Sequence, residues 1–352
     1  MKKYIIIIAS IILIGLTAFF ILMPTAEDYN KKADLLYNQK KYIEALDLYE
    51  KAAEKESSHA YYRIGELYLL GLGIEKSEEK AIKYLTKAAE KDQTEAQNLL
   101  GRYYFDRKEF DKSYQQFSKA VIKGNSESEY YLGLQYQFGL GTEQNYEKAF
   151  KLYEKASVYN NDAKFRLGYL YINGTGTEQN YEKAFKLFTL TANSGITESY
   201  NVLGYLYDHG YGVEENVEEA CIWFRKGANS NDSEAQYNLA NKLWKGDGIV
   251  KNREEALYWF QKAAEQGHER SIKFINDFNR WKESVERKEE EERRRKEKGK
   301  PRICPGCNGT GRVLAGTGKW ENCGLCRGSG IYRSFENQWS DMIDAIDGLF
   351  GY

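Results

Sequence analysis

The sequence predicts an all-α fold whose main body is an α/α superhelical solenoid of about seven helix pairs, and two observations support this prediction. The twelve residues GTEQNYEKAFKL occupy 141–152 and return unchanged at 176–187. Mostly small residues also recur at steps of 32 to 36 residues, a spacing typical of stacked helical repeats. The equivalent positions are Ala33, Gly65, Gly101, Gly133, Gly168, Gly204, Ala240 and Asn276.

Each repeat is predicted to contain two helices. Apolar residues recur with the 3.6-residue period of a helix in both halves of a repeat. Leu167 and Tyr171 mark the first helix of one repeat, and Phe185 and Phe188 mark its second. We expect the small residue of the first helix to let the second helix approach closely. Because one pair cannot bury its own apolar side, neighbouring pairs must stack.

A G-x-G turn joins the two helices in five of the repeats. These glycines lack the preceding strand and the G-x-x-x-x-G-K-[ST] or G-x-G-x-x-G spacing of a phosphate-binding loop. We therefore interpret them as turns that precede a helix. Four residues after each second glycine stands a residue that can cap the next helix through its side chain. These predicted N-caps are Ser77, Asn145, Asn180, Asn216 and Asn252.

The repeats resemble a known family. The stretch AKFRLGYLYINGTGTEQNYEKAFKLFTLTANSG, at 163–195, resembles a Sel-one-like repeat, the longer relative of the tetratricopeptide repeat. The stretch ADLLYNQKKYIEALDLYEKAAEKE, at 33–56, resembles the tetratricopeptide form itself. This resemblance covers about 30–280 and implies a superhelix that serves as a protein-binding scaffold or adaptor.

Two tyrosines are the candidates for partner binding. Tyr169 and Tyr205 occupy an off-core phase in successive repeats, where they are expected to line a groove; an ordinary solvated helix face is the alternative. The three histidines fall at unrelated repeat positions, so no catalytic set emerges and no enzyme is expected. The 51 basic and 52 acidic residues balance, so no nucleic acid partner is expected. A small-molecule substrate is not expected either.

The first residues predict a membrane anchor. Residues 4–23 carry no charge and are long enough for a helix that crosses a bilayer. Lys2 and Lys3 would keep the N-terminus cytoplasmic, which predicts a single-pass membrane protein with the bulk of the chain extracytoplasmic. A cleaved signal peptide is the alternative, but its apolar region is usually shorter and ends at an A-x-A-like site.

Four further segments follow the anchor. The solenoid is assigned to 27–281, and a charged helical spacer to 282–300, where acidic and basic residues stand three or four apart. A cysteine module occupies 302–333. The last segment, 334–352, is predicted to be an amphipathic tail helix that packs within the chain or docks in a partner's groove.

The cysteine module has the spacing of a zinc site. Two C-x₂-C pairs stand fifteen residues apart, which is typical of four thiolates around one structural zinc ion. The doubled C-x-x-C-x-G-x-G also resembles the cysteine-rich zinc module of DnaJ-type co-chaperones, although no HPD tripeptide of a J-domain is present. The expected ligands are Cys304, Cys307, Cys323 and Cys326.

We interpret the chain as a membrane-anchored scaffold or adaptor. In this hypothesis the solenoid groove binds a partner protein, and the zinc module adds a second contact or only caps the fold. The alternative is a thiol-disulfide oxidoreductase or chaperone-like protein that uses the paired C-x-x-C motifs. Disulfides among the four cysteines are also consistent with an oxidising compartment.

Overall fold

The structure is a computed structural model that describes residues 24–299, 312–314 and 320–322, with side chains described for 24–294. Two compact units, Met1–Ile275 and Asn276–Tyr352, divide the chain, and each is described by itself.

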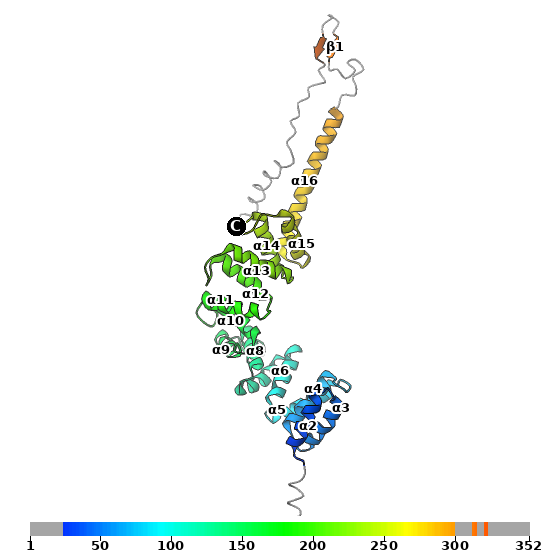
Figure 1. The fold of residues 1–352 in the computed structure, drawn as a ribbon, viewed down its shortest axis with the longest axis vertical. Helices are drawn as coiled ribbons and strands as arrows, with labels where there is room; N and C mark the ends of the chain where they lie inside the picture. The colour runs from blue at the N-terminus through cyan, green and yellow to red at the C-terminus, as the bar shows by residue number, and fades with distance from the viewer. Residues whose placement is uncertain (1–23, 300–311, 315–319, 323–352) are drawn as a thin grey trace, which may run out of the picture. The chain divides into compact units, whose positions relative to one another are not determined.

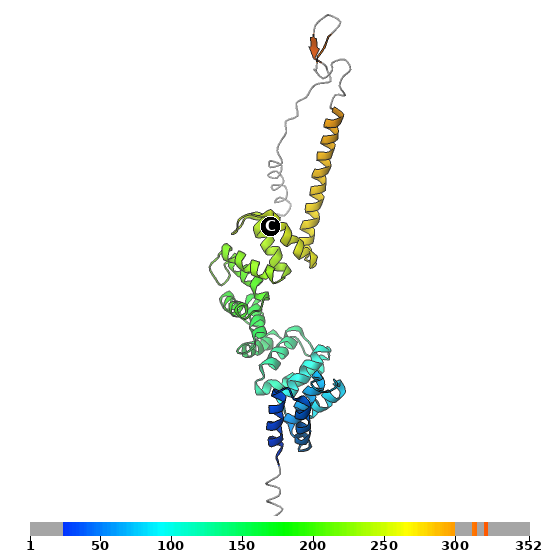
Figure 2. The same ribbon diagram turned by 45° about the vertical axis from the view of Figure 1, so that its right-hand side comes forward.

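Helices α2 to α15 form seven pairs that follow one another in chain order (Figures 1 and 2), and each helix packs chiefly against the helices before and after it. The predicted α/α solenoid is therefore confirmed. The helices are α2 (Ala26–Asn38), α3 (Tyr42–Glu54), α4 (Ser58–Leu70), α5 (Glu78–Glu90), α6 (Thr94–Asp106), α7 (Phe110–Ala120) with the 3₁₀ turn η1 (Val121–Lys123), α8 (Ser126–Phe138), α9 (Tyr146–Ala156), α10 (Asn161–Asn173), α11 (Tyr181–Asn193), α12 (Glu198–His209), α13 (Val217–Asn229), α14 (Ser233–Lys245), α15 (Arg253–Glu265) and α16 (Glu269–Gly299).

The small residue of each first helix lies against a large residue of its partner helix, as the sequence predicts. A Cβ placed on Gly168 would lie 2.8 Å from the ring of Phe188, and one on Gly204 would lie 2.5 Å from the ring of Phe224. Both rings are almost fully buried. Only a residue without a side chain therefore allows the two helices to approach this closely around a buried ring.

The G-x-G turns do more than reverse the chain. The first glycine ends the helix in the left-handed conformation, as at Gly139 with φ of 67°. The second lies against the preceding repeat, because a Cβ on Gly141 would stand 2.5 Å from the carbonyl of Phe110 at the start of α7. All five predicted N-caps accept a hydrogen bond from the helix they begin.

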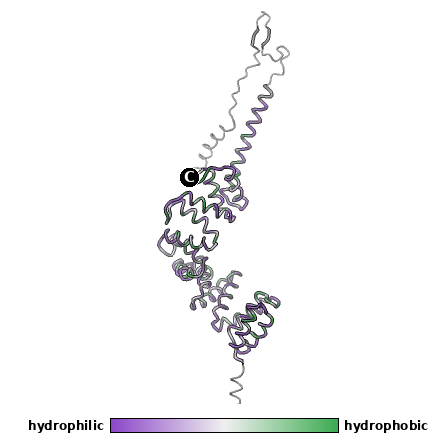
Figure 3. The backbone as a smooth tube through the Cα atoms, viewed as in Figure 1, coloured by the Kyte–Doolittle hydropathy of each residue, from purple (hydrophilic) through white to green (hydrophobic). Residues whose placement is uncertain are grey.

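Each solenoid helix mixes hydrophilic and hydrophobic residues (Figure 3), since one side faces the core and the other does not. Cys221 is 3% exposed, and burial raises the pKa of its thiol to about 11. The prediction that Cys221 is a small buried residue is thus confirmed, and at neutral pH its thiol stays protonated and unreactive.

Helix α16 starts in the solenoid unit and continues without a break to Gly299, across the predicted boundary between solenoid and spacer. Strands β1 (Arg312–Leu314) and β2 (Trp320–Asn322) pair antiparallel, with Arg312 opposite Asn322. The predicted tail helix lies outside the described residues.

The predicted membrane localisation, with a cytoplasmic N-terminus and an extracytoplasmic bulk, requires correction. No helix in the described part of the chain is both long and apolar enough to cross a bilayer. Helices of 11 to 13 residues rise only about 20 Å, less than the hydrocarbon core, and α16, with 31 residues, is dense with charge. The predicted anchor at 4–23 lies outside the described residues.

Candidate binding groove

A cavity of about 560 Å³ lies along the first helices of consecutive pairs, α10, α12 and α14, and extends to the start of α16. We call it the C-terminal groove. Its lining combines aromatic rings, asparagine amides and paired charges. The lining residues are Tyr169, Ile172, Asn173, Asn201, Val202, Tyr205, Asp208, His209, Phe224, Glu234, Asn238, Asn241, Lys242, Lys245, Asp247 and Arg270.

The two tyrosines predicted from the sequence both line this groove. Tyr169 lies edge-on to the buried ring of Phe188, with 5.2 Å between ring centroids. Tyr205 is 43% exposed, and its ring lies 4.2 Å from that of His209. Tyr169 therefore forms part of the wall, whereas Tyr205 offers a ring face to the cavity.

The groove also contains residues that the sequence prediction missed. Tyr169, Tyr205 and Asn241 each stand one residue after the small residue of their repeat. The register that selected the two tyrosines also marks Asn241, but an asparagine on a helix surface gives no signal by composition. Residues at one repeat position follow one another along a stacked solenoid, so this position forms one wall of the groove.

Three asparagines supply amide groups to the groove. Asn238 donates through Nδ2 to Oδ1 of Asn201, from the next repeat back, over 2.9 Å. Asn241 donates through Nδ2 to the carbonyl oxygen of Tyr237 over 3.0 Å. These bonds fix the orientation of all three amides and use only part of their hydrogen-bonding capacity.

The charged residues of the groove are largely paired with each other. Lys242 donates to Asp208 and to Asp247, with 2.6 Å between its Nζ and Oδ2 of Asp247. Burial lowers the pKa of Lys242, but the two carboxylates outweigh it and hold the pKa above its ordinary value. Arg270 donates to Glu234 over 2.7 Å. The charge pairs therefore tie α12, α14 and α16 together.

A serine, a histidine and a glutamate stand in line beside the groove, but their arrangement is structural. His268 Nδ1 lies 3.0 Å from Ser271 Oγ, and its Nε2 lies 3.0 Å from Glu234. The Ser271 N–H donates to the same Nδ1, so Nε2 carries the hydrogen that is donated to Glu234. Since Ser271 is completely buried, no substrate reaches its hydroxyl, and His268 caps the first turn of α16.

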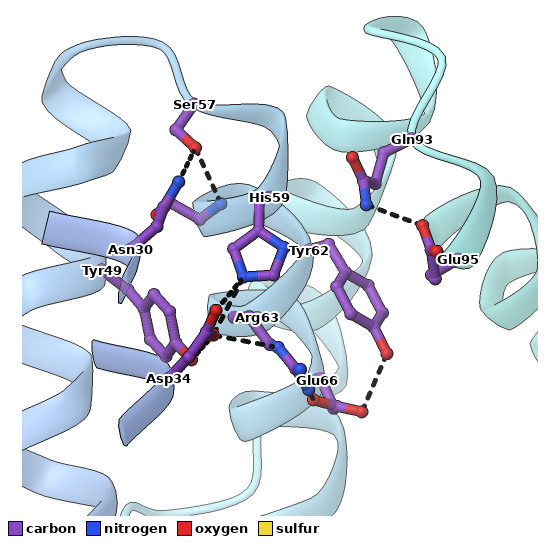
Figure 4. Close-up of polar contacts among 11 residues, drawn as sticks. Asn30, Asp34, Tyr49, Ser57, His59, Tyr62, Arg63, Glu66, Gln93 and Glu95 are labelled. Atoms are coloured by element: carbon purple, nitrogen blue, oxygen red, sulfur yellow. Dashed lines mark hydrogen bonds and ion pairs between the residues drawn. The ribbon is translucent and has the colours of Figure 1, made fainter. Parts of the chain in front are cut away.

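The first two helix pairs hold a different arrangement at the same repeat positions (Figure 4). Asp34 accepts hydrogen bonds from Tyr49, over 2.6 Å, and from His59, over 2.9 Å. Glu66 accepts from Arg63 over 2.9 Å and from Tyr62 over 3.0 Å. We call these side chains the N-terminal polar cluster, which consists of Asp34, Tyr49, His59, Tyr62, Arg63 and Glu66.

The N-terminal polar cluster is electrostatically self-contained. Burial raises the pKa of the Asp34 carboxyl, but hydrogen bonds from Tyr49 and His59 outweigh it and hold the pKa below its ordinary value. Burial beside Glu66 raises the pKa of the Tyr62 hydroxyl. The carboxylates are thus satisfied within the protein and do not require a ligand.

The four predicted zinc ligands lie outside the described residues, so their geometry is not seen. Among the side chains that the structure describes, no cluster of histidine, cysteine or acidic residues could hold a metal ion.

The repeats match a family model described as Sel1 repeat, at residues 38–57, 58–93, 94–120, 126–157, 161–196, 197–232 and 233–268. The chain belongs to the Sel1 repeat family. Sel1 repeat proteins are generally protein-interaction scaffolds, and the repeat fold is typically non-catalytic.

Two crystal structures place this Sel1 repeat chain among known relatives. One is a protective antigen present in uropathogenic Escherichia coli strains, which displays an SLR fold. It is 30% identical, with a TM-score of 0.64, over 69% of this chain and 54% of that chain. The Sel1 chain thus spans about half the length of the antigen. A Sel1 repeat protein from Oxalobacter formigenes is 30% identical over 70% of this chain and 86% of that chain, with a TM-score of 0.44. No curated protein matches the sequence.

Proposed function

We propose that this Sel1 repeat protein is a scaffold that holds a partner protein in the C-terminal groove. The observation that carries the proposal is the partly unused amide capacity of Asn201, Asn238 and Asn241 beside the exposed ring of Tyr205. Cavities that bind ligands combine apolar walls with a few oriented polar groups. The family's general role as interaction scaffolds supports the same proposal.

A pair of matched substitutions tests this function. Asn241→Arg places a long cation in the groove, and Tyr258→Arg places the same side chain on α15 at a residue that is 53% exposed and outside the groove lining. Proteins that co-purify with the full chain from its source cells are expected to be lost with Asn241→Arg and kept with Tyr258→Arg. Equal recovery with both variants would contradict the groove as the binding face.

We further propose that Cys304, Cys307, Cys323 and Cys326 hold one structural zinc ion. The register of β1 and β2 supports this, because it sets Arg312, five residues after Cys307, opposite Asn322, directly before Cys323. A hairpin of this register shortens the path between the two C-x₂-C pairs. A tetrathiolate site would supply folding free energy to a segment of few residues, and it would offer the scaffold a second contact surface.

Metal content and thiol count test the zinc site on the full chain purified under reducing conditions. The proposal expects about one zinc per chain, lost when the four cysteines are replaced by serine. Metal-free protein that forms two disulfides in air would overturn it and would favour thiol-disulfide exchange at the paired motifs instead.

A further inference from the structure

The amides of the C-terminal groove have hydrogen-bonding groups left over. An asparagine side chain can donate two hydrogen bonds and accept two. The bond from Asn238 to Asn201 leaves both N–H groups of Asn201 and the carbonyl oxygen of Asn238 without a bond to any residue that the structure describes. Donors of one repeat thus stand beside an acceptor of the next, at the wall of one cavity.

This pattern of donors and acceptors fits an extended polypeptide better than a helix. An extended segment presents both its carbonyl oxygens and its N–H groups to a neighbour, as when a strand is added to a sheet edge. A helix has already used these groups within itself. A helical occupant would cover the amides of Asn201 and Asn238 and leave them unsatisfied, which is unfavourable.

A row of rings next to the amides offers a surface for one flat side chain. His209 lies between Tyr205, at 4.2 Å, and Tyr211, at 5.4 Å. Tyr211 in turn stacks on Tyr181, at 4.6 Å and an interplanar angle of 17°. Proline and aromatic side chains pack on such faces with little loss of conformational entropy.

The charges of the lining say what the segment carries. Three carboxylates, Asp208, Glu234 and Asp247, stand with three cations, Lys242, Lys245 and Arg270. The lining is therefore neutral when its histidine is uncharged, and it gives a strongly charged segment no electrostatic advantage.

We propose that the C-terminal groove binds an extended, uncharged polypeptide segment, with Asn201 and Asn238 bonded to one of its peptide groups and a proline or aromatic residue on the ring of Tyr205. This inference rests on the proposed scaffold function and names the kind of segment that the scaffold recognises.

The test is a selection of random twelve-residue peptides, displayed on phage, against the full chain, followed by binding measurements on synthetic copies. The selected peptides are expected to carry proline or an aromatic residue and to lack apolar residues at helical spacing. Asn201→Ala and Asn238→Ala should each weaken binding about five- to tenfold, the effect of losing one hydrogen bond. Asn229→Ala, on α13 and outside the groove lining, is the control and should leave binding unchanged.

A second measurement makes the main-chain contact specific. Methylation of the contacted peptide nitrogen should weaken binding to the unaltered protein about as much as Asn238→Ala does, and it should have little further effect on that variant. Circular dichroism melting of each variant confirms that the solenoid remains folded.

Three outcomes would overturn the inference. Selected peptides that are helical, and whose binding survives both asparagine substitutions and N-methylation, would refute the extended mode and leave the scaffold function intact, provided that Asn241→Arg still abolishes their binding. Binding that also survives Asn241→Arg would contradict the proposed function itself. A selection that enriches no peptide would refute recognition of a short segment, while the co-purified partners would still judge the scaffold function.

Discussion

The two ends of the solenoid use one backbone arrangement for opposite purposes. Asp34 and Glu66 stand one residue after the small residue of their repeats, as Tyr205 and Asn241 do. In the N-terminal polar cluster these side chains accept hydrogen bonds from neighbouring side chains and close the surface (Figure 4). In the C-terminal groove the same positions carry a ring and an amide beside a cavity.

The comparison teaches that the repeat supplies positions, and that the side chains at these positions decide whether a surface is closed or open. A carboxylate near buried tyrosine and arginine groups is satisfied locally, because both of its oxygens accept strong hydrogen bonds. A tyrosine ring or an amide has no such internal partner, so part of it stays available. The predictions below separate the shared framework from the two surfaces.

The largest effect is expected from Phe224→Ala, which breaks the framework beneath the groove. Phe224 is 2% exposed and fills the space above Gly204. Loss of a buried phenylalanine ring costs about 3–5 kcal/mol in the free energy of unfolding. Because repeats couple chiefly to their neighbours, amide hydrogen exchange should rise in α11 to α14 and stay nearly unchanged in α2 to α5.

Uniform acceleration of exchange across all helices would contradict this nearest-neighbour account. Tyr258→Ala, at an exposed ring on α15, is the matched control and should change stability by less than about 0.5 kcal/mol.

Asp34→Asn opens the N-terminal polar cluster and should cost about 1–3 kcal/mol at pH 7, because the buried Tyr49 then loses its charged acceptor. The folded-state pKa of Asp34 lies below its ordinary value, so its stabilisation is full above about pH 4 and is lost as the pH falls through the folded-state pKa. Urea unfolding at pH 7 and at pH 3 should therefore show a difference between the two proteins that shrinks on acidification. A difference that grows at pH 3 would refute the role of the Asp34 carboxylate.

The smallest effect is expected at Glu129, between the two regions. This residue of α8 is 7% exposed, and burial raises the pKa of its carboxyl, against the effect of Lys155. In two other repeats the equivalent residue is glutamine, and Gln97 and Gln236 donate to the carbonyl oxygen eight residues before them. Glu129→Gln should therefore stabilise the protein by about 1 kcal/mol at pH 7.

The sign of the pH dependence at Glu129 is opposite to that at Asp34. With a raised folded-state pKa, the protonated carboxyl favours folding at low pH, and this contribution disappears as the pH rises through the folded-state pKa. The advantage of Glu129→Gln should accordingly vanish near pH 4 in thermal melts. Gln97→Glu is the reverse control and should destabilise the protein at pH 7 but not at pH 4.

Much of the framework could be predicted from local sequence, because caps, turns and close-approach glycines each depend on a few neighbouring residues. Tyr169 and Tyr205 could be placed on the groove from repeat register alone. The bond between Asn201 and Asn238 could not, since it depends on how far one helix pair is rotated against the next. The contact of Gly141 with Phe110 depends on the same rotation. The N-terminal polar cluster escaped because His59 has no counterpart in the other repeats.

The most direct test of the central claim is photo-crosslinking from two equivalent repeat positions. A benzoylphenylalanine residue is introduced in place of Tyr205, in the C-terminal groove, or in place of Glu66, in the N-terminal polar cluster, and the full chain is irradiated in its source cells. The account predicts discrete crosslinks to a partner protein from position 205, abolished by Asn241→Arg, and none of these from position 66. Crosslinks to the same partner from position 66 alone would contradict the assignment of binding to the C-terminal groove.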